Sequence, residues 1–144
     1  MVKAFKNAIR RRRERSREAL LQRLEGELDG IYDLIFQMCG DGVHSLQLLE
    51  RVLRRCMTLS KRERYERYLR LWAFGVTVDC LRRAYPRFLA ERTADQTVPF
   101  EFLTMDDKLI FFLHDRARLS YEEIAAIMNC PIGTVRSRIF RARE

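Results

Sequence analysis

The residues best suited to chemistry lie near the end of the chain, where arginines alternate with small residues between positions 132 and 143. On a helix Val135, Ile139 and Ala142 would share one face, because they are three and four positions apart. The polar residues outside that face are Thr134, Arg136, Ser137, Arg138 and Arg141. Guanidinium and hydroxyl groups bind the phosphates and base edges of DNA. The pattern predicts a helix that packs on one side and contacts DNA on the other.

Local signals upstream would position this helix. Ser120 and Glu123 have the spacing of a capping box, which predicts a helix that begins after Ser120. Asn129 is suited to a left-handed helix end, and Pro131 is tolerated in the first turn of a new helix. A short helix, a tight turn and a second helix with an arginine-rich outer face form a helix-turn-helix. The alternative is an ordinary helical hairpin with a solvated basic face.

These residues also carry a family resemblance. The runs YEEIA at 121–125, GTVRSR at 133–138 and RAR at 141–143 resemble region four of bacterial RNA polymerase sigma factors, of the extracytoplasmic-function (ECF) type. The resemblance implies that this segment binds the −35 promoter element in the major groove. Ser137, Arg138 and Arg141 would then read bases, and Thr134 and Arg136 would lie nearer the DNA backbone.

The composition is consistent with a nucleic-acid partner. The 144 residues carry a formal net charge of +8, which favours a polyanion and makes a membrane surface the weaker alternative. Sparse glycine and proline and short β-branched runs predict an all-α protein. No apolar run approaches the roughly 20 residues that span a bilayer, and the N-terminus is too charged for a secretory signal. We therefore expect no membrane insertion and a cytoplasmic location.

Residues 1–25 form a strongly basic segment, with nine lysines and arginines against three glutamates. One interpretation is a solvated helix that leads into the core, since Ala19, Leu20 and Leu24 begin an apolar stripe. The other is an arm that touches DNA phosphates and adds to salt-dependent affinity. The two interpretations are compatible, and both stay open.

Residues 26–85 are predicted to form a helical domain. Apolar residues follow a helical period over 28–39 and again over 46–56, and Gly40-Asp41-Gly42 interrupts them. A basic tract with interleaved tyrosines and a tryptophan follows from position 60. Aromatic rings stack on unpaired bases for roughly 1–3 kcal/mol each while arginines hold the backbone. The alternative is a core helix in which Tyr68 and Trp72 pack inward and the arginines are solvated.

This tract resembles region two of the same family, through Leu69, Ala73, Asp79, Arg82 and Arg83. The resemblance implies a domain that grips the clamp helices of the polymerase β′ subunit and captures the −10 element, with further contact to the β subunit. The implied −10 residues are Arg64, Arg67, Tyr68, Trp72, Arg82 and Arg83. The implied polymerase contacts are Leu48, Leu49, Glu50 and Leu53.

Region two also departs from the family pattern. The segment 45–51, SLQLLER, stands where the family has acidic residues, and Gly75 replaces the usual asparagine of the −10 helix. These departures favour an alternative function, a sigma-like regulator that binds DNA or polymerase without opening promoters. A third hypothesis is a module held by an anti-sigma protein, with Leu46, Leu49 and Leu53 facing that partner.

The expected organisation is two small helical domains joined by a linker. The linker would cover 86–103, which contains Pro86 and Pro99, and the second domain would cover 104–144. His44 and His114 lie in different predicted domains without an evident nucleophile, and the four cysteines are far apart. A glycine-rich phosphate loop is also lacking. We therefore expect no enzyme activity, no metal site and no cofactor.

Overall fold

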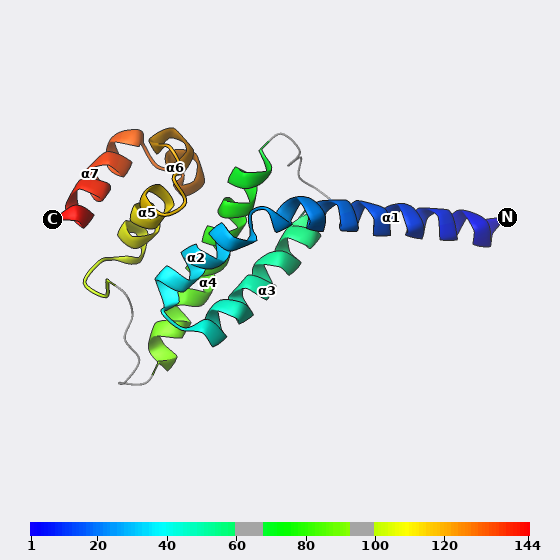
Figure 1. The fold of residues 1–144 in the computed structure, drawn as a ribbon, viewed down its shortest axis with the longest axis horizontal. Helices are drawn as coiled ribbons and strands as arrows, with labels where there is room; N and C mark the ends of the chain where they lie inside the picture. Colours follow the sequence, from blue (N-terminus) through cyan, green and yellow to red (C-terminus); the bar gives the residue numbers. More distant parts are fainter. Residues whose placement is uncertain (60–67, 93–99) are drawn as a thin grey trace.

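The computed structural model describes residues 1–59, 68–92 and 100–144. These residues form seven helices: α1 (Val2–Glu25), α2 (Leu28–Cys39), α3 (Gly42–Leu59), α4 (Leu69–Glu91), α5 (Met105–Asp115), α6 (Tyr121–Met128) and α7 (Ile132–Arg143). Figure 1 shows α2, α3 and α4 packed as one bundle, α5–α7 as a second group, and α1 projecting from the bundle. The all-α prediction is confirmed.

The turn between α2 and α3 forms where the sequence predicts it. Gly40 has a φ of 69°, the left-handed conformation that glycine adopts without steric cost, and its amide donates to the Phe36 carbonyl at 2.7 Å. Asp41 then provides hydrogen-bond acceptors for the first turn of α3. Its carboxylate accepts from the Val43 amide at 2.8 Å, and its carbonyl accepts from the Ser45 hydroxyl at 2.6 Å.

Helix α4 is longer than predicted. The sequence places a linker from Pro86 onward, but α4 continues through Pro86 to Glu91. Pro86 and Arg82 are both exposed, so the carbonyl that proline leaves without an amide partner lies on the solvent side. Buried Tyr85 and partly buried Phe88 keep the helix packed on either side of the proline. Residues 93–99 of the predicted linker lie outside the described residues.

The second helical group begins at Thr104, the first residue of the predicted second domain, and its helix-turn-helix forms at the predicted signals. Thr104 caps α5 by accepting from the Asp107 amide at 3.2 Å. Ser120 and Glu123 form the predicted capping box, because each side chain accepts from the backbone amide of the other residue, at 3.1 and 2.9 Å. Asn129 ends α6 with a φ of 52°. The helix-turn-helix geometry is therefore specified locally.

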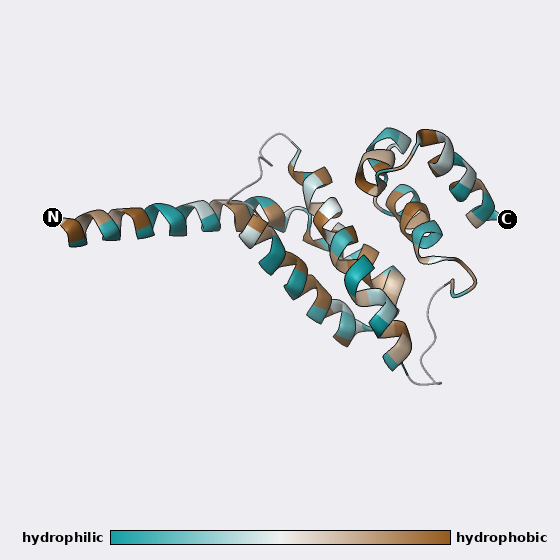
Figure 2. Cartoon of the chain, turned by 180° about the vertical axis from the view of Figure 1, so that it is seen from behind, coloured by the Kyte–Doolittle hydropathy of each residue, from teal (hydrophilic) through white to brown (hydrophobic). Residues whose placement is uncertain are grey.

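The two groups pack directly against each other. Helices α5 and α6 contact α2 and α4, and the buried side chains form one continuous hydrophobic cluster across both groups. Hydrophobic residues (brown in Figure 2) recur along each helix of both groups. At the rim, Arg116 donates two hydrogen bonds to the Asp33 carboxylate, both at 3.0 Å, and these hold the pKa of Asp33 below its ordinary value.

Lys108 of α5 lies inside this contact. Its side chain is 1% exposed, and its ammonium donates to the Tyr85 hydroxyl of α4 at 2.8 Å. Burial is the main cause that lowers the pKa of Lys108 to about 8. The contact between the two helical groups therefore contains a buried charge, and the desolvation of this charge lowers the stability of the folded protein.

Candidate nucleic-acid interface

Helix α7 separates a packed side from an exposed side, as the sequence predicts. Val135 and Ile139 are buried against α5 and α6. Arg136, Ser137 and Arg141 are exposed, whereas Thr134 is half-buried, with its carbonyl accepting from the Ser137 hydroxyl at 3.1 Å. The exposed side thus presents a hydroxyl and guanidinium groups on one rigid helix, which is the arrangement that a DNA groove accepts.

The arginines of α7 are not equivalent. Arg138 is half-buried and donates to the Asp107 carboxylate of α5 at 3.1 Å, so it ties α7 to α5. Arg141 lies 3.9 Å from the same carboxylate, but its side chain is 62% exposed. The guanidinium of Arg136 lies over the Tyr121 ring, 5.8 Å from its centroid. Arg141 and Arg136 are therefore better placed than Arg138 to reach DNA.

Phe140 also belongs to the exposed side of α7, and the predicted contact set omits it. Its side chain is 67% exposed beside Arg141. Its position on the helical period, away from Val135 and Ile139, already excludes it from the packed side. An exposed ring next to an arginine can contact a thymine methyl group in the major groove.

The predicted −10 residues that the structure describes lie on or next to α4. Tyr68 is 59% exposed, and Trp72 is half-buried in a hollow whose other wall includes Ala126 and Ile127 of α6. Arg82 contacts Asp106 of α5 at 3.4 Å, and Arg83 contacts Asp79 at 3.3 Å. Arg64 and Arg67 lie outside the described residues. In this arrangement α6 stands beside the predicted −10 face.

Gly75 lies in the middle of α4, and a methyl group at its Cβ position would meet no atom within 4 Å. Gly75→Ala should therefore raise the free energy of unfolding by about 1 kcal/mol, because alanine loses less backbone entropy in a helix and fits without strain. Urea unfolding followed by circular dichroism measures the change. Gly40→Ala is the matched control, and it should destabilise because of the positive φ at that position. A destabilised Gly75→Ala variant would contradict the open space seen here.

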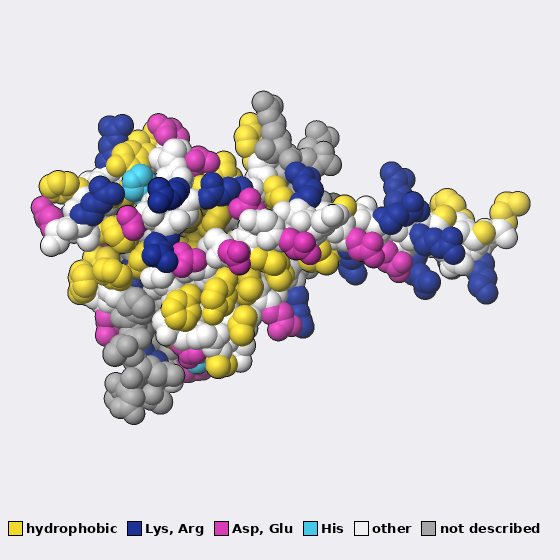
Figure 3. Space-filling model, in the orientation of Figure 1, with side chains coloured by type: hydrophobic (Ala, Val, Ile, Leu, Met, Phe, Trp, Pro, Cys, Tyr) yellow, Lys and Arg dark blue, Asp and Glu magenta, His cyan; other side chains and the backbone are white. Residues whose placement is uncertain are grey.

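The predicted polymerase contacts are only partly on the surface. Leu48 is 7% exposed and belongs to the core, whereas Leu49 and Leu53 are partly buried and Glu50 is exposed. Figure 3 shows hydrophobic side chains gathered over α2 and α3. Leu46, 60% exposed, is the most accessible leucine of α3. Leu46 is outside the predicted set of polymerase contacts, and it is the accessible member of the stripe of Leu46, Leu49 and Leu53 predicted to face an anti-sigma partner.

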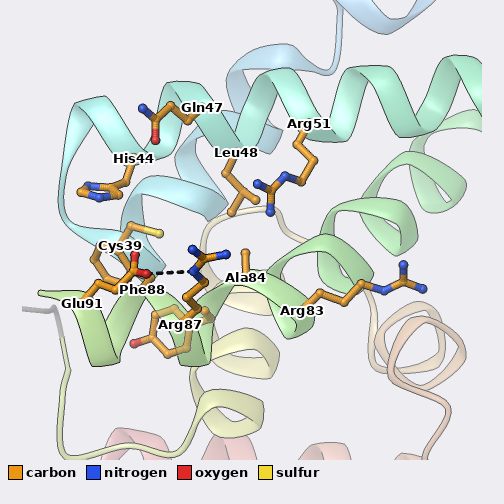
Figure 4. Close-up of a pocket in the computed structure, with 11 residues that line it drawn as sticks. Cys39, His44, Gln47, Leu48, Arg51, Arg83, Ala84, Arg87, Phe88 and Glu91 are labelled. Carbon is orange, nitrogen blue, oxygen red and sulfur yellow. Dashed lines mark hydrogen bonds and ion pairs between the residues drawn. The ribbon is translucent and has the colours of Figure 1, made fainter.

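A second basic surface lies between α3 and α4, and the sequence did not predict it. A hollow of about 370 Å³ is lined by Arg51, Arg83 and Arg87, with Leu48 and Phe88 among its apolar lining (Figure 4). Arg87 is paired with Glu91 at 2.8 Å. These arginines come from two helices, so only the packing of α3 on α4 brings them together.

Two other kinds of site are not found in the part of the chain that the structure describes. Within residues 1–59, 68–92 and 100–144 no helix is sufficiently long and apolar to cross a bilayer. The same residues contain no cluster of three or more histidine, cysteine, aspartate or glutamate side chains suited to a metal ion.

Comparison with known proteins identifies the C-terminal segment. Residues 103–144 match the family model "Sigma-70, region 4". The chain is 64% identical over 44 residues to the ECF RNA polymerase sigma-E factor of Escherichia coli K12, a match covering 31% of this chain and 23% of that protein. It is 50% identical over 62 residues to the RNA polymerase sigma-H factor of Pseudomonas aeruginosa, covering 43% of this chain and 31% of that protein. Each match spans less than a third of the relative.

A solved structure extends the likeness to the fold of nearly the whole chain. The sigma factor RpoE of Bartonella quintana, crystallised with the anti-sigma factor NepR, superposes with a TM-score of 0.72 at 19% identity, covering 88% of this chain and 92% of that one. The resemblance inferred from the sequence is confirmed. Residues 103–144 thus match region 4 of Sigma-70 proteins and resemble that region of ECF sigma factors, and the chain shares its fold with a sigma factor.

Proposed function

We propose that this protein is a DNA-binding transcription initiation factor that brings core RNA polymerase to promoters. The observation that carries the proposal is the exposed side of α7, in a segment that matches region 4 of sigma factors. Arg136, Ser137 and Arg141 contact the −35 element from this helix, and Arg138 positions the helix through Asp107. The role is binding rather than catalysis.

The N-terminal bundle supplies the remaining contacts in this proposal. Tyr68, Trp72, Arg82 and Arg83 approach the −10 element along α4, and the surface around Leu46 and Glu50 meets the polymerase β′ clamp helices. Residues 26–91 act as the polymerase-binding unit and residues 104–144 as the −35 reader. The fold shared with a sigma factor over 88% of the chain supports this division.

In-vitro transcription tests the proposal. Purified core RNA polymerase is combined with the full chain, the upstream region of its own gene and a pool of genomic fragments. We expect discrete start sites that depend on this protein. The matched control is Ser137→Ala/Arg141→Ala, which leaves the packed side of α7 intact and should lose those starts. Absence of transcripts, together with absence of polymerase in a pull-down, would refute the initiation role.

A second candidate function is a sigma-like regulator that binds polymerase or DNA without opening promoters. It is favoured by the hollow that Trp72 shares with α6, because α6 stands where a captured DNA strand would approach. Permanganate reactivity of unpaired thymines separates the two functions. Bound polymerase with no reactive thymines near the start site would support the regulator, and reactive thymines would support the initiation factor.

An anti-sigma partner is a further part of the proposal. The sigma factor with the same fold was crystallised with an anti-sigma factor. In this chain the surface around Leu46 is both apolar and exposed, which suits a partner helix. Leu46→Asp should weaken capture of such a partner while leaving the buried core unchanged.

A further inference from the structure

Helix α1 is a long basic rod that stands clear of the rest of the protein. Its 24 residues extend about 36 Å at 1.5 Å per residue, and Figure 1 shows most of that length projecting from the bundle. Leu20 and Leu24 are its buried residues and anchor its C-terminal end. Every residue from Met1 to Ala19 is exposed. The rod is therefore held at one end and available to a partner along the rest.

The exposed part of α1 carries a concentrated charge. Residues 1–19 contain eight lysines and arginines against two glutamates. Arg10 lies 3.6 Å from Glu14 on the exposed surface, and such a pair adds little stability. Several cations, among them Arg13 and Arg17, are three or four residues apart, where like charges disfavour a helix. A polyanion would replace this repulsion with attraction.

The cations of α1 gather on two opposite sides of the helix. At 100° per residue, one side holds Lys3, Lys6, Arg10, Arg13 and Arg17, and the opposite side holds Arg11, Arg12 and Arg15. Arg13 also borders the line that joins Ile9 and Leu20, so it interrupts the apolar side. A helix that lies on a membrane needs a continuous apolar face. Figure 2 instead shows teal and brown residues mixed along α1. Cations on two opposite sides fit a partner that presents negative charge on both sides of the helix.

We propose that α1 inserts its basic segment into the major groove of duplex DNA, where phosphates flank a helix on both sides. The major groove of B-DNA admits an α-helix, whereas that of an RNA duplex is too narrow. The proposal rests on the proposed function for DNA as the partner, but it adds a separate contact. Because α1 and α7 lie at opposite ends of the molecule in Figure 1, the arm touches DNA away from the −35 reader. Its contacts are to phosphates, which carry no sequence information.

Two variants of the full chain test the arm in opposite directions. The first changes Arg10, Arg11, Arg12 and Arg13 to Gln, and the second is Glu14→Gln/Glu18→Gln. Dissociation constants are measured by fluorescence anisotropy across a salt series, on a −35 duplex, a scrambled duplex and an RNA duplex. The Arg variant should bind both DNA duplexes at least about tenfold more weakly, with a salt slope lower by up to about 3.6. The Glu variant should bind both more tightly, a gain that misfolding cannot produce.

The charge-conserving control changes the same four arginines to lysine and should retain most of the affinity, since phosphate contacts require charge. DNA binding that is unchanged in the Arg and Glu variants would overturn the proposal. Binding to phosphatidylglycerol vesicles is measured as well. If the Arg variant loses binding to the vesicles but binds DNA as the parent does, α1 is a membrane-binding helix and the proposal is wrong. Equal binding of the parent to duplex RNA would overturn groove insertion.

The same data separate the arm from the proposed function. The ratio of affinities for the −35 and scrambled duplexes reports α7, and the arm variants should leave that ratio unchanged. A parent protein without sequence preference but with an arm-dependent salt slope would refute the proposed function and keep the arm. A clear preference for the −35 duplex, with arm variants that bind both duplexes as the parent does, would support the proposed function and overturn the arm.

Discussion

Lys108→Met should raise the free energy of unfolding at pH 7 by on the order of 3 kcal/mol. The ammonium of Lys108 is buried, with its pKa lowered to about 8 from 10.5, so the folded protein bears the cost of desolvating a charge. Methionine fills similar space without that charge. For a chain of this size the melting temperature should rise by roughly 5–10 °C, measured by differential scanning calorimetry.

The free energy of unfolding should also depend on pH differently in the parent and in Lys108→Met. Between pH 8 and 10.5 the unfolded chain holds a proton that folded Lys108 has released, so this residue makes the free energy of unfolding rise with pH. Burial raises the pKa of Cys39 to about 11 and that of Tyr85 to about 12, so stability falls above about pH 9 through Cys39 and above about pH 10 through Tyr85. The parent should therefore gain stability from pH 8 to 9, and Lys108→Met should not.

Lys6→Met, at an exposed position of α1, is the matched control and should leave the pH profile unchanged. Tyr85→Phe removes the hydroxyl that accepts from Lys108 and should destabilise the protein below pH 8. If Lys108→Met melts at the same temperature as the parent and keeps its pH profile, the ammonium is solvated and the two helical groups do not bury it.

Arg141→Ala should weaken binding to the preferred −35 duplex by roughly tenfold to a hundredfold, equivalent to about 1–3 kcal/mol. The reason is that Arg141 lies on the exposed side of α7 and keeps most of its side chain accessible despite the nearby Asp107. A guanidinium there can form two hydrogen bonds with a guanine edge. Anisotropy titration at fixed salt on preferred and scrambled duplexes measures the effect.

Arg143→Ala is the matched control, since it removes the same charge from the same exposed last turn of α7. It should weaken binding to both duplexes slightly and equally, because a phosphate contact carries no sequence information. An equal loss on preferred and scrambled DNA for Arg141→Ala would refute base reading and leave a phosphate contact. Arg138→Ala should instead lower stability, through its loss of Asp107.

The parts that local chemistry specifies could be predicted from the sequence. The capping box at Ser120 and Glu123, the left-handed end at Asn129 and the stripe of Val135 and Ile139 depend on neighbours within four residues, so the helix-turn-helix follows from its own segment. Gly40 marks a turn for the same reason. These predictions are confirmed by the geometry.

The rest depends on contacts between distant segments. Arg138 stays a predicted base reader, but its hydrogen bond to Asp107, 31 residues away, depends on the packing of α7 on α5. Lys108 is a charged residue that only the packing of α5 on α4 buries. Pro86 signals a helix end, but packing on both sides of it outweighs the lost hydrogen bond. The hydrogen bond of Arg138, the burial of Lys108 and the helical conformation at Pro86 all depend on contacts between segments that are distant in the sequence.

The ion pairs at the rim between the two helical groups change what a salt titration of this protein measures. In the proposed function, a −10 strand that enters the hollow beside Trp72 would displace α5 and α6 from the bundle, and this displacement would break the contacts of Arg116 with Asp33 and of Arg82 with Asp106. Salt screens these exposed pairs and so lowers the cost of opening, while it also weakens phosphate contacts. The two effects oppose each other. A promoter that needs both DNA elements should therefore show a shallower salt slope per phosphate contact than a duplex with the −35 element alone.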